Sequence, residues 1–346
     1  MKTILVTGGA GFIGSNFIKY MLEKYPDYKI INIDLLTYSG NLENLREVEN
    51  NPNYTFVKED IVNLQKIKEI FEKHKPNIVV NFAAESHNDR GVLDPSIFIK
   101  TNILGTQSLL EASRQTGVER FHHISTCEVF GDLPLDSEET FSETSSYRPK
   151  TPYNASKAGA DHIVRAYFNT FGTPVTISNC GNNYGPNQHV EKLIPLFATN
   201  ALEDKELPLF KSSQNKREWV HVLDHCKAVD LIIHDGVPGE SYNVGTAIEK
   251  SVEQITDTIL KVLGKPETLK KYIQDRQGHD RRYLLDSSKI RKDLNWKPQI
   301  DFEEGMKQTI EWYKNNKQWW QSVKSGEFRE YYEKYYSKLK NENRGV

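Results

Sequence analysis

Apolar residues in the first 180 positions follow two alternating patterns. Short runs rich in β-branched residues are typical of buried strands, and longer stretches with apolar residues three or four positions apart are typical of helices. Predicted strands cover residues 2–7, 29–34, 54–57, 78–82, 121–124 and 175–179, and predicted helices lie around 17–22, 67–73, 98–116 and 153–171. This alternation predicts an α/β fold with a parallel, doubly wound sheet of the Rossmann type.

The pattern changes after Cys180. The remaining chain predicts a turn at 181–186, strands at 207–210 and 241–244, and helices at 192–202, 224–234, 251–263, 284–294 and 302–315. We therefore expect a Rossmann domain of residues 1–180, to which segments of about 219–244 return, and a smaller C-terminal α/β domain of 181–325. Residues 326–346, rich in Tyr, Lys and Glu, predict a polar tail.

Composition excludes several classes of protein. A net charge of −2 over 346 residues disfavours nucleic-acid and membrane-surface partners. No apolar run approaches the length of a membrane span, and Met1-Lys2-Thr3 leads directly into a strand, so neither a span nor a signal peptide is predicted. The cysteines, Cys127, Cys180 and Cys226, are odd in number and widely spaced. They predict no disulfide framework, no metal site and a cytoplasmic location.

A glycine-rich loop, Gly8-Gly-Ala-Gly-Phe-Ile-Gly14, joins the first predicted strand to the first helix. In this context glycines allow the backbone to approach a pyrophosphate at the helix N-terminus. Asp34 ends the second strand, where a carboxylate accepts hydrogen bonds from ribose hydroxyls and repels a 2′-phosphate. The sequence therefore predicts a dinucleotide site that prefers NAD to NADP.

A candidate reaction centre follows the strand at 121–124. Ser125, Thr126, Cys127 and Glu128 come where a parallel strand ends, which is where ligands bind in open α/β sheets, although such residues are also ordinary at the start of a loop. Tyr153 and Lys157 are four residues apart and share one face of a predicted helix. A neighbouring cation lowers the pKa of a phenol, so this pair can supply a base near neutral pH.

Basic residues in the second half suggest phosphate contacts. Arg217, His279, Arg281 and Arg282 are candidates, with solvated surface side chains as the alternative. Asp89 and Arg90, which follow the strand at 78–82, fit a surface ion pair as well as a ligand site.

From residue 3 to about 315 the chain resembles the extended short-chain dehydrogenases/reductases, and among them the dTDP-glucose 4,6-dehydratase family. The resemblance rests on motifs spread over both predicted domains. They are Thr7-Gly-Gly-Ala-Gly-Phe-Ile-Gly14, Asp34 with Leu36-Thr-Tyr-Ser-Gly-Asn41, Ala83-Ala-Glu-Ser-His87, Ser125-Thr-x-Glu-Val-x-Gly131, Tyr153-x-Ala-Ser-Lys157, Asn182-Asn-Tyr-Gly-Pro186, Glu191-Lys-Leu-Ile-Pro195 and Gly278-His-Asp-Arg-Arg-Tyr283.

The resemblance implies a reaction and the residues that perform it. It implies a tightly bound NAD that is regenerated in each turnover, and a nucleotide-diphosphate hexose that is oxidised at C4, loses water across C5–C6 and receives hydride at C6. Tyr153, poised by Lys157, would take the proton of the 4-hydroxyl, Thr126 would bind the same oxygen, and Glu128 would remove the C5 proton. A homodimer through helices 98–116 and 153–171 is also implied.

The contacts expected from the motifs and the resemblance form two sets. The cofactor set is Gly8, Gly11, Phe12, Ile13, Gly14, Asp34, Leu35, Thr37, Asp60, Ile61, Ala83, Ala84, Tyr153 and Lys157. The set for the nucleotide sugar is Ser86, His87, Asn88, Asn182, Glu191, Lys192, Leu193, Pro208, Phe210, Arg217, Asn243, His279 and Arg282.

The chain departs from the family pattern at several positions. Cys127 replaces an aspartate that, in the family, protonates the leaving hydroxyl. Three alternatives follow. The Cys127 thiol serves as the acid, Glu128 serves as both acid and base, or Cys127 only fills space. Phe130 replaces a tyrosine, and Asn88 and Gly91 replace valine and serine on the loop expected to face the sugar. The Phe210-Lys-Ser-Ser segment also differs from the usual base pocket.

These departures leave both UDP-N-acetylglucosamine and dTDP-glucose as candidate substrates. The polar amide gained at Asn88 and the side chain lost at Gly91 favour a sugar with a 2-acetamido group. Two other functions stay open at this point. A nucleotide-sugar 4-epimerase shares Tyr153 and Lys157 but needs no Glu128, and a non-catalytic NAD-binding regulator would keep only the glycine loop.

Overall fold

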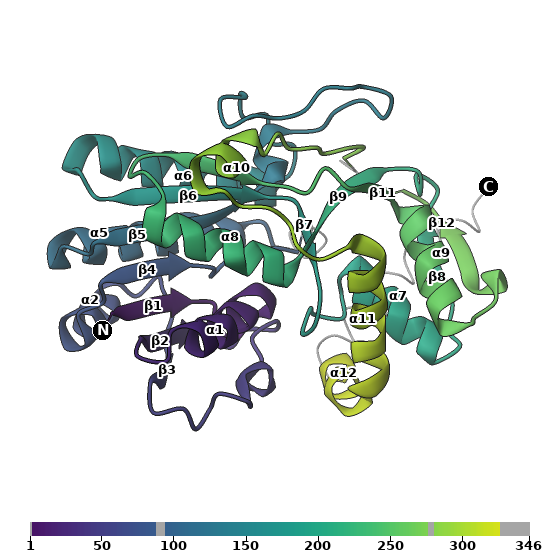
Figure 1. The fold of residues 1–346 in the computed structure, drawn as a ribbon, viewed down its shortest axis with the longest axis horizontal. Helices are drawn as coiled ribbons and strands as arrows, with labels where there is room; N and C mark the ends of the chain where they lie inside the picture. Colours follow the sequence, from purple (N-terminus) through teal and green to yellow (C-terminus); the bar gives the residue numbers. More distant parts are fainter. Residues whose placement is uncertain (1, 88–93, 276–279, 326–346) are drawn as a thin grey trace.

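The computed structural model describes residues 2–87, 94–275 and 280–325. Its centre is a parallel seven-stranded sheet in the order β10-β6-β5-β4-β1-β2-β3 (Figure 1). The strands are β1 (Thr3–Thr7), β2 (Lys29–Asp34), β3 (Tyr54–Lys58), β4 (Ile78–Asn81), β5 (Arg120–Thr126), β6 (Val175–Cys180) and β10 (Ser241–Val244). The predicted doubly wound Rossmann sheet is confirmed.

Helices cover both faces of this sheet (Figure 1). On one face α1 (Phe12–Lys24) and α8 (Val222–Asp235) pack over Ile4 and Val6 of β1. On the other face α2 (Leu64–His74), α5 (Thr106–Thr116) and α6 (Pro152–Phe171) pack over Leu5. Alternate residues of β1 are therefore buried on opposite sides, which explains why its sequence is almost continuously apolar.

The predicted helix 98–116 has an irregular first half. A short α4 (Ser96–Phe98) leads into a π-helical segment, η2 (Ile99–Gly105), before α5 begins. Within η2 the buried Asn102 side chain bonds the backbone N–H and C=O of Glu85 and the Ser156 hydroxyl. The π-helical turn thus ties the loop after β4 to α6.

The chain after Cys180 forms two small sheets. One has the order β11-β9-β7, with β7 (Asn182–Tyr184), β9 (Lys216–His221) and β11 (Glu249–Ser251), and the other pairs β8 (Leu207–Phe210) with β12 (Lys270–Ile273). A separate apolar core lies among helices that follow Cys180. These are α7 (Leu193–Leu202), α9 (Val252–Leu263), α11 (Phe302–Asn315) and α12 (Lys317–Lys324).

Several elements differ from the prediction. β7 lies within the expected turn, α10 (Ser288–Leu294) begins four residues later than expected, and β9, β11, β12 and α12 were not predicted. The short helices η1 (Leu42–Leu45), η3 (Cys127–Phe130) and η4 (Glu267–Leu269) were not predicted either. Strands of three or four residues have too little periodicity to be distinguished from loops, because their pairing partners are distant in sequence.

Residues before α10 pair with the loop that precedes α6. The pair is Phe141 and Leu285, which form an isolated parallel bridge. The chain also returns through α8 and β10, since β10 pairs with β6 in the first sheet. None of the helices within the described ranges is long and apolar enough to span a membrane.

Candidate active site

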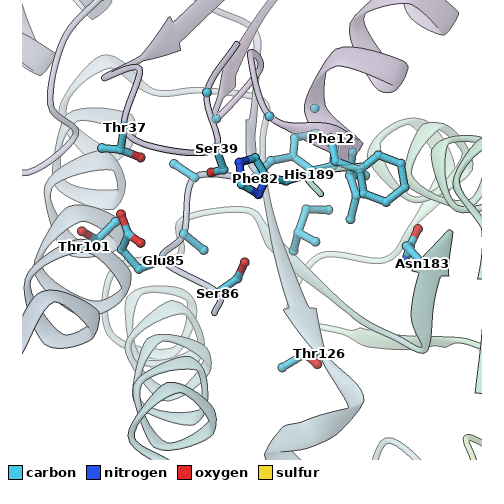
Figure 2. Close-up of a pocket in the computed structure, with 18 of the residues that line it drawn as sticks. Phe12, Thr37, Ser39, Phe82, Glu85, Ser86, Thr101, Thr126, Asn183 and His189 are labelled. Carbon is cyan, nitrogen blue, oxygen red and sulfur yellow. The ribbon is translucent and has the colours of Figure 1, made fainter. Parts of the chain in front are cut away.

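A cavity of about 310 Å³ opens at the carboxyl ends of the central strands. Register places these ends side by side, with Thr7 opposite both Ile33 and Asn81, and Thr126 opposite Cys180. In Figure 2, Thr126 at the end of β5 and Asn183 of β7 approach the same space from the two domains. The cavity therefore lies where a doubly wound sheet binds its ligand.

The glycine loop forms one wall without side chains. Gly8 has a positive φ of 67°, and a Cβ atom there would lie 2.7 Å from Ala83 Cα. A Cβ atom on Gly14 would lie 2.4 Å from the carbonyl oxygen of Gly8. Both positions are too close for any other residue, so the first turn of α1 packs directly against the loop.

The N-terminus of α1 faces this wall. Gly11 is its N-cap residue, and no side chain caps the first helical N–H groups. Such N–H groups and the helix dipole favour a bound phosphate.

Asp34 lies at the end of β2, on the cavity wall. Its two carboxylate oxygens accept the backbone N–H groups of Ala10, at 2.9 Å, and Leu36, at 2.8 Å. Burial raises the pKa of this carboxyl, and the two backbone donors lower it. The carboxylate is thereby fixed at the edge of the site, which suits the ribose of a dinucleotide.

The predicted cofactor residues gather around this wall. All of them line the cavity: Gly8, Gly11, Phe12, Ile13, Gly14, Asp34, Leu35, Thr37, Asp60, Ile61, Ala83, Ala84, Tyr153 and Lys157. The side-chain-free glycine wall, the uncapped helix and the anchored carboxylate together fit NAD.

Tyr153 lies in the first turn of α6, which Thr151 caps through the backbone N–H of Asn154. Burial raises the pKa of its phenol well above the ordinary value, nearby Glu128 adds to the rise, and a hydrogen bond to Thr126 opposes it. A base at this position therefore requires a cation close to the phenol.

Lys157 is the cation one turn further along α6, and it is buried. Its Nζ donates to the Ile124 carbonyl at 2.6 Å and lies 3.1 Å from Nε2 of His123. Burial lowers the pKa of this amine to about 8, against the raising effect of Asp161.

Thr126 and Glu128 are presented by the turn after β5. The Thr126 hydroxyl accepts the backbone N–H of Glu128 at 3.3 Å, which starts the short helix η3. Both residues line the cavity with Tyr153. A hydroxyl, a carboxylate and a phenol therefore surround the space at the end of β5.

Cys127 lies between them in sequence but faces the other way. Its side chain is 2% exposed and packs in an apolar cluster with Val129, Phe130, Tyr283 and Leu285. It is not among the described residues that line the cavity. Burial raises the pKa of the thiol well above its ordinary value. The geometry thus gives no support to the expectation that this thiol faces the sugar.

Four predicted sugar-nucleotide residues also line the cavity: Ser86, Asn182, Glu191 and Lys192. Lys192 Nζ donates to the Ser86 carbonyl at 2.9 Å, and Glu191 lies 3.8 Å from Nε2 of the buried His87. These contacts join the loop after β4 to the segment before α7. Asn88, Gly91, Asp89, Arg90 and His279 lie outside the described residues.

The remaining predicted ligands lie elsewhere. Arg282 forms a two-pronged ion pair with Glu249, at 2.7 and 2.9 Å, and is 4% exposed. Arg217 donates to the carbonyls of Asp280 and Arg281 and stacks on Tyr283. Both guanidinium groups have partners within the protein, and their phosphate contacts stay a prediction.

The other predicted ligands are Asn243, Pro208, Phe210 and Leu193, and they lie in well-packed parts of the structure. Asn243 is buried and donates to the Phe141 and Asp286 carbonyls. Pro208 is buried in β8, next to the half-buried Phe210. Leu193 begins α7, where it packs against the second core. Arg281, a further candidate, pairs with Asp132 on the exposed side of the loop.

The structure adds residues that the sequence did not single out. They are Cys180, Asn183, Gln188 and His189 from around the reaction centre, and Ser39, Gly40, Glu59, Phe82, Glu85 and Thr101 from the cofactor side. Cys180 ends β6, and the rule that found Thr126 at the end of β5 would have found it as well. Burial raises the pKa of its thiol to about 12.

Comparison with known proteins agrees with this geometry. The profile of the GDP-mannose 4,6 dehydratase family matches residues 5–309. A dTDP-glucose 4,6-dehydratase of Escherichia coli is 46% identical over 352 aligned residues, covering 94% of this chain and 97% of that protein.

Solved structures extend the similarity to the fold. A dTDP-glucose 4,6-dehydratase from Streptomyces venezuelae, solved with NAD bound, superposes with a TM-score of 0.89 at 43% identity, covering 93% of this chain and 99% of that one. A UDP-glucose 4-epimerase from Thermotoga maritima reaches 0.84 at 30% identity, covering 90% and 99%. The chain therefore belongs to the GDP-mannose 4,6-dehydratase family, as an NAD-dependent nucleotide-sugar 4,6-dehydratase of the extended short-chain dehydrogenase/reductase fold.

Proposed function

We propose that this enzyme converts dTDP-glucose to its 4-keto-6-deoxy derivative. The observation that carries the proposal is the meeting of Thr126, Glu128, Tyr153 and Lys157 in the same cavity as the glycine wall and Asp34. Glu128 separates this proposal from the epimerase alternative, because a 4-epimerase needs no second base at C5. The extensive identity with dTDP-glucose 4,6-dehydratases supports the choice of sugar.

Each residue has a defined task in this proposal. Tyr153 takes the proton of the sugar 4-hydroxyl, Thr126 hydrogen-bonds the same oxygen, and Lys157 stabilises the phenolate. The glycine wall and Asp34 would hold NAD, which would supply the oxidant for C4 and the hydride for C6. Glu128 removes the C5 proton, which the adjacent C4 ketone has made acidic.

The leaving 6-hydroxyl must receive a proton, and Glu128 is the suitable donor on the cavity wall. Once it has taken the C5 proton it is a neutral acid beside the departing oxygen, so the same carboxyl serves both steps. Cys127 then only fills space behind the turn, which is the third of the alternatives that the sequence left open. Its burial in an apolar cluster supports this assignment.

The test is to incubate the protein separately with dTDP-glucose and UDP-N-acetylglucosamine and to follow the mass of each nucleotide sugar. We expect dTDP-glucose to lose one water, about 18 mass units. Loss only from the UDP sugar would assign the changed specificity to Asn88 and Gly91, which favour that sugar by sequence alone. Loss of water from neither would overturn the proposal for both substrates.

We also propose a homodimer through η2, α5 and α6. Ile99 and Leu104 are about half exposed on η2, at 49% and 50%, and Phe171 is 54% exposed at the end of α6. Large apolar side chains exposed on η2 and at the end of α6 are typical of an interface. Light scattering should give twice the monomer mass, and Leu104→Glu should halve it, whereas Val237→Glu, at an equally exposed loop position, should not.

A further inference from the structure

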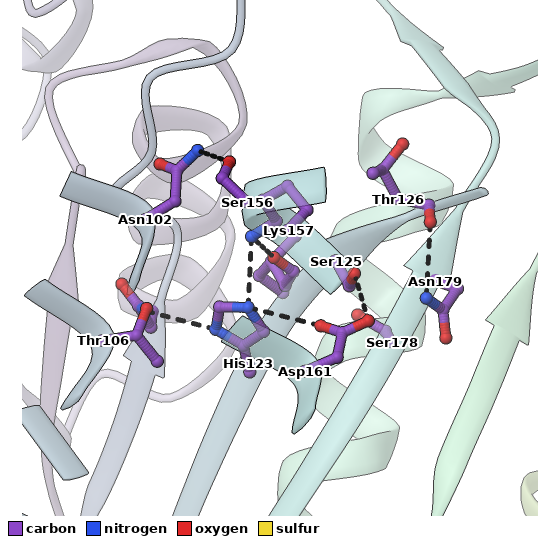
Figure 3. A network of polar contacts seen from close by, with 12 residues as sticks. Asn102, Thr106, His123, Ser125, Thr126, Ser156, Lys157, Asp161, Ser178 and Asn179 are labelled. Atoms are coloured by element: carbon purple, nitrogen blue, oxygen red, sulfur yellow. Dashed lines mark hydrogen bonds and ion pairs between the residues drawn. The ribbon is translucent and has the colours of Figure 1, made fainter. Parts of the chain in front are cut away.

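A buried polar network lies behind the catalytic lysine (Figure 3). His123 of β5 is fully buried, and its Nε2 atom is 3.1 Å from Lys157 Nζ and 3.6 Å from Asp161 Oδ1. Lys157 and Asp161 are one turn apart on α6, so both reach the same side of the imidazole. The mechanism described above uses neither His123 nor Asp161.

Hydrogen bonds around Asn81 determine where the imidazole proton lies. The Asn81 carbonyl oxygen accepts the Thr7 hydroxyl at 2.6 Å, so its amide nitrogen faces His123 Nδ1 at 3.2 Å and Thr106 at 3.1 Å. Nδ1 is therefore an acceptor, and a neutral ring carries its proton on Nε2. That proton points into the space shared by Lys157 and Asp161.

An Nε2–H group cannot hydrogen-bond a fully protonated ammonium, because both are donors. At 3.1 Å the two groups are compatible when the Lys157 amine is neutral, accepts the imidazole proton and donates to the Ile124 carbonyl. In this arrangement the amine is directed toward the protein interior. A proton on the amine would require the imidazole proton to find another acceptor.

Asp161 offers that acceptor. Its Oδ2 atom is held by the hydroxyls of Ser125 and Tyr147, both at 2.8 Å. Its Oδ1 atom is buried and has no hydrogen-bond partner among the residues that the structure describes. An unpaired buried carboxylate oxygen is costly, and it lies where a small shift of the imidazole would bring the Nε2 proton.

We propose that His123 and Asp161 are positioning residues for Lys157. His123 retains the neutral amine behind the cavity, and Asp161 accepts the imidazole proton when the amine is protonated and turns toward Tyr153. In the protonated arrangement the Tyr153 hydroxyl proton has moved to the amine, which leaves a phenolate next to an ammonium. No group is oxidised or reduced in this transfer.

Other charged groups around the network set its electrostatics. Burial lowers the pKa of His123 most, and Lys157, His122 and Arg165 of α6 lower it further. Burial lowers the pKa of Lys157, and the nearby Asp161 raises it. Asp161 is therefore the carboxylate through which a substitution should alter the protonation of the lysine.

The first test compares two neighbouring histidines. His123→Gln should lower kcat about tenfold or more with KM within about twofold, because the histidine touches no substrate. His122→Gln is the matched control, since His122 is equally buried but points to Thr176 and Ser178. Both variants should lose similar thermal stability. Equal loss of kcat in the two variants would overturn the proposal.

The second test is the pH profile of Asp161→Asn. Without the carboxylate the ammonium is less stable, so the alkaline limb of kcat/KM should move to lower pH and the acid limb, which reports Tyr153, to higher pH. A profile that superposes on that of the parent enzyme would contradict the role of Asp161. If Asp161→Asn does not fold, the comparison of His123→Gln with His122→Gln tests the proposal.

A third measurement needs no turnover. Nitrogen-15 spectra of the histidine-labelled protein should show His123 as a neutral ring with its proton on Nε2 near neutral pH, assigned by its loss in His123→Gln. A proton on Nδ1 would overturn the proposed arrangement. These spectra do not test the proposed function. A parent enzyme that shows no dehydratase activity would count against that function instead.

Discussion

A Cβ atom on Gly8 would lie 2.7 Å from the Cα atom of Ala83, because the glycine turn and the end of β4 meet backbone to backbone. Gly8→Ala should therefore push these segments apart and abolish NAD binding, measured by calorimetry. Gly117→Ala is the matched control, with the same φ of 67° but no atom within 4 Å. It should cost about 1 kcal/mol of stability and keep NAD binding. Retained NAD affinity in Gly8→Ala would contradict the expected close approach.

Glu128→Gln should separate oxidation from elimination. The variant keeps Tyr153 and Lys157, so reduced nicotinamide should form when substrate is added, but water loss should fall about a hundredfold or more without a base at C5. Absorbance of reduced nicotinamide and product mass report the two steps. The exposed Glu138→Gln should behave as the parent does. Unchanged water loss in Glu128→Gln would show that another group is the base.

Cys127→Ala should leave turnover within about twofold of the parent value, because the thiol packs in an apolar cluster and not on the cavity wall. Its cost should appear as a loss of about 1 kcal/mol in the free energy of unfolding. Normal oxidation of C4 with a large loss of water elimination would instead identify the thiol as the acid.

Arg282→Met should affect stability and not substrate affinity. It leaves the Glu249 carboxylate without its guanidinium partner, and breaking such a buried pair costs about 3 kcal/mol. KM for the nucleotide sugar should stay unchanged. Lys66→Met, which breaks an exposed pair with Glu69, should change the free energy of unfolding far less. A raised KM with full stability would restore the phosphate-binding role predicted for Arg282.

His234 should make stability depend on pH. Its Nδ1 atom lies 3.0 Å from Asp230 Oδ1, and this contact raises the pKa of the imidazole above its unfolded value. The raised pKa means that the contribution is complete below the unfolded pKa, about 6.5, and is lost as pH rises through the folded pKa. His234→Gln should therefore reduce the free energy of unfolding more in mild acid than in mild alkali. An equal reduction at both pH values, or the same pH dependence in an Asp230→Asn background, would contradict this assignment.

Local sequence patterns were enough to predict the Rossmann half and the cofactor wall of the site. Consecutive parallel strands produce strong local signals, and the rule that ligands bind at strand carboxyl ends locates Gly8, Asp34 and Thr126 without coordinates. The pair of Tyr153 and Lys157 could also be predicted, because helical spacing alone places the two residues on one face. The fold class and the enzyme family follow from these local patterns.

Only the tertiary structure decided which way neighbouring side chains point. Thr126 and Cys127 are adjacent in sequence, yet the tight turn after β5 directs one into the cavity and the other into an apolar cluster. The guanidinium of Arg282 is engaged by Glu249, thirty-three residues away. The partners of His123 come from β4 and α6, again far along the chain. Contacts of this kind depend on the packing of distant segments, and no periodicity in the sequence encodes them.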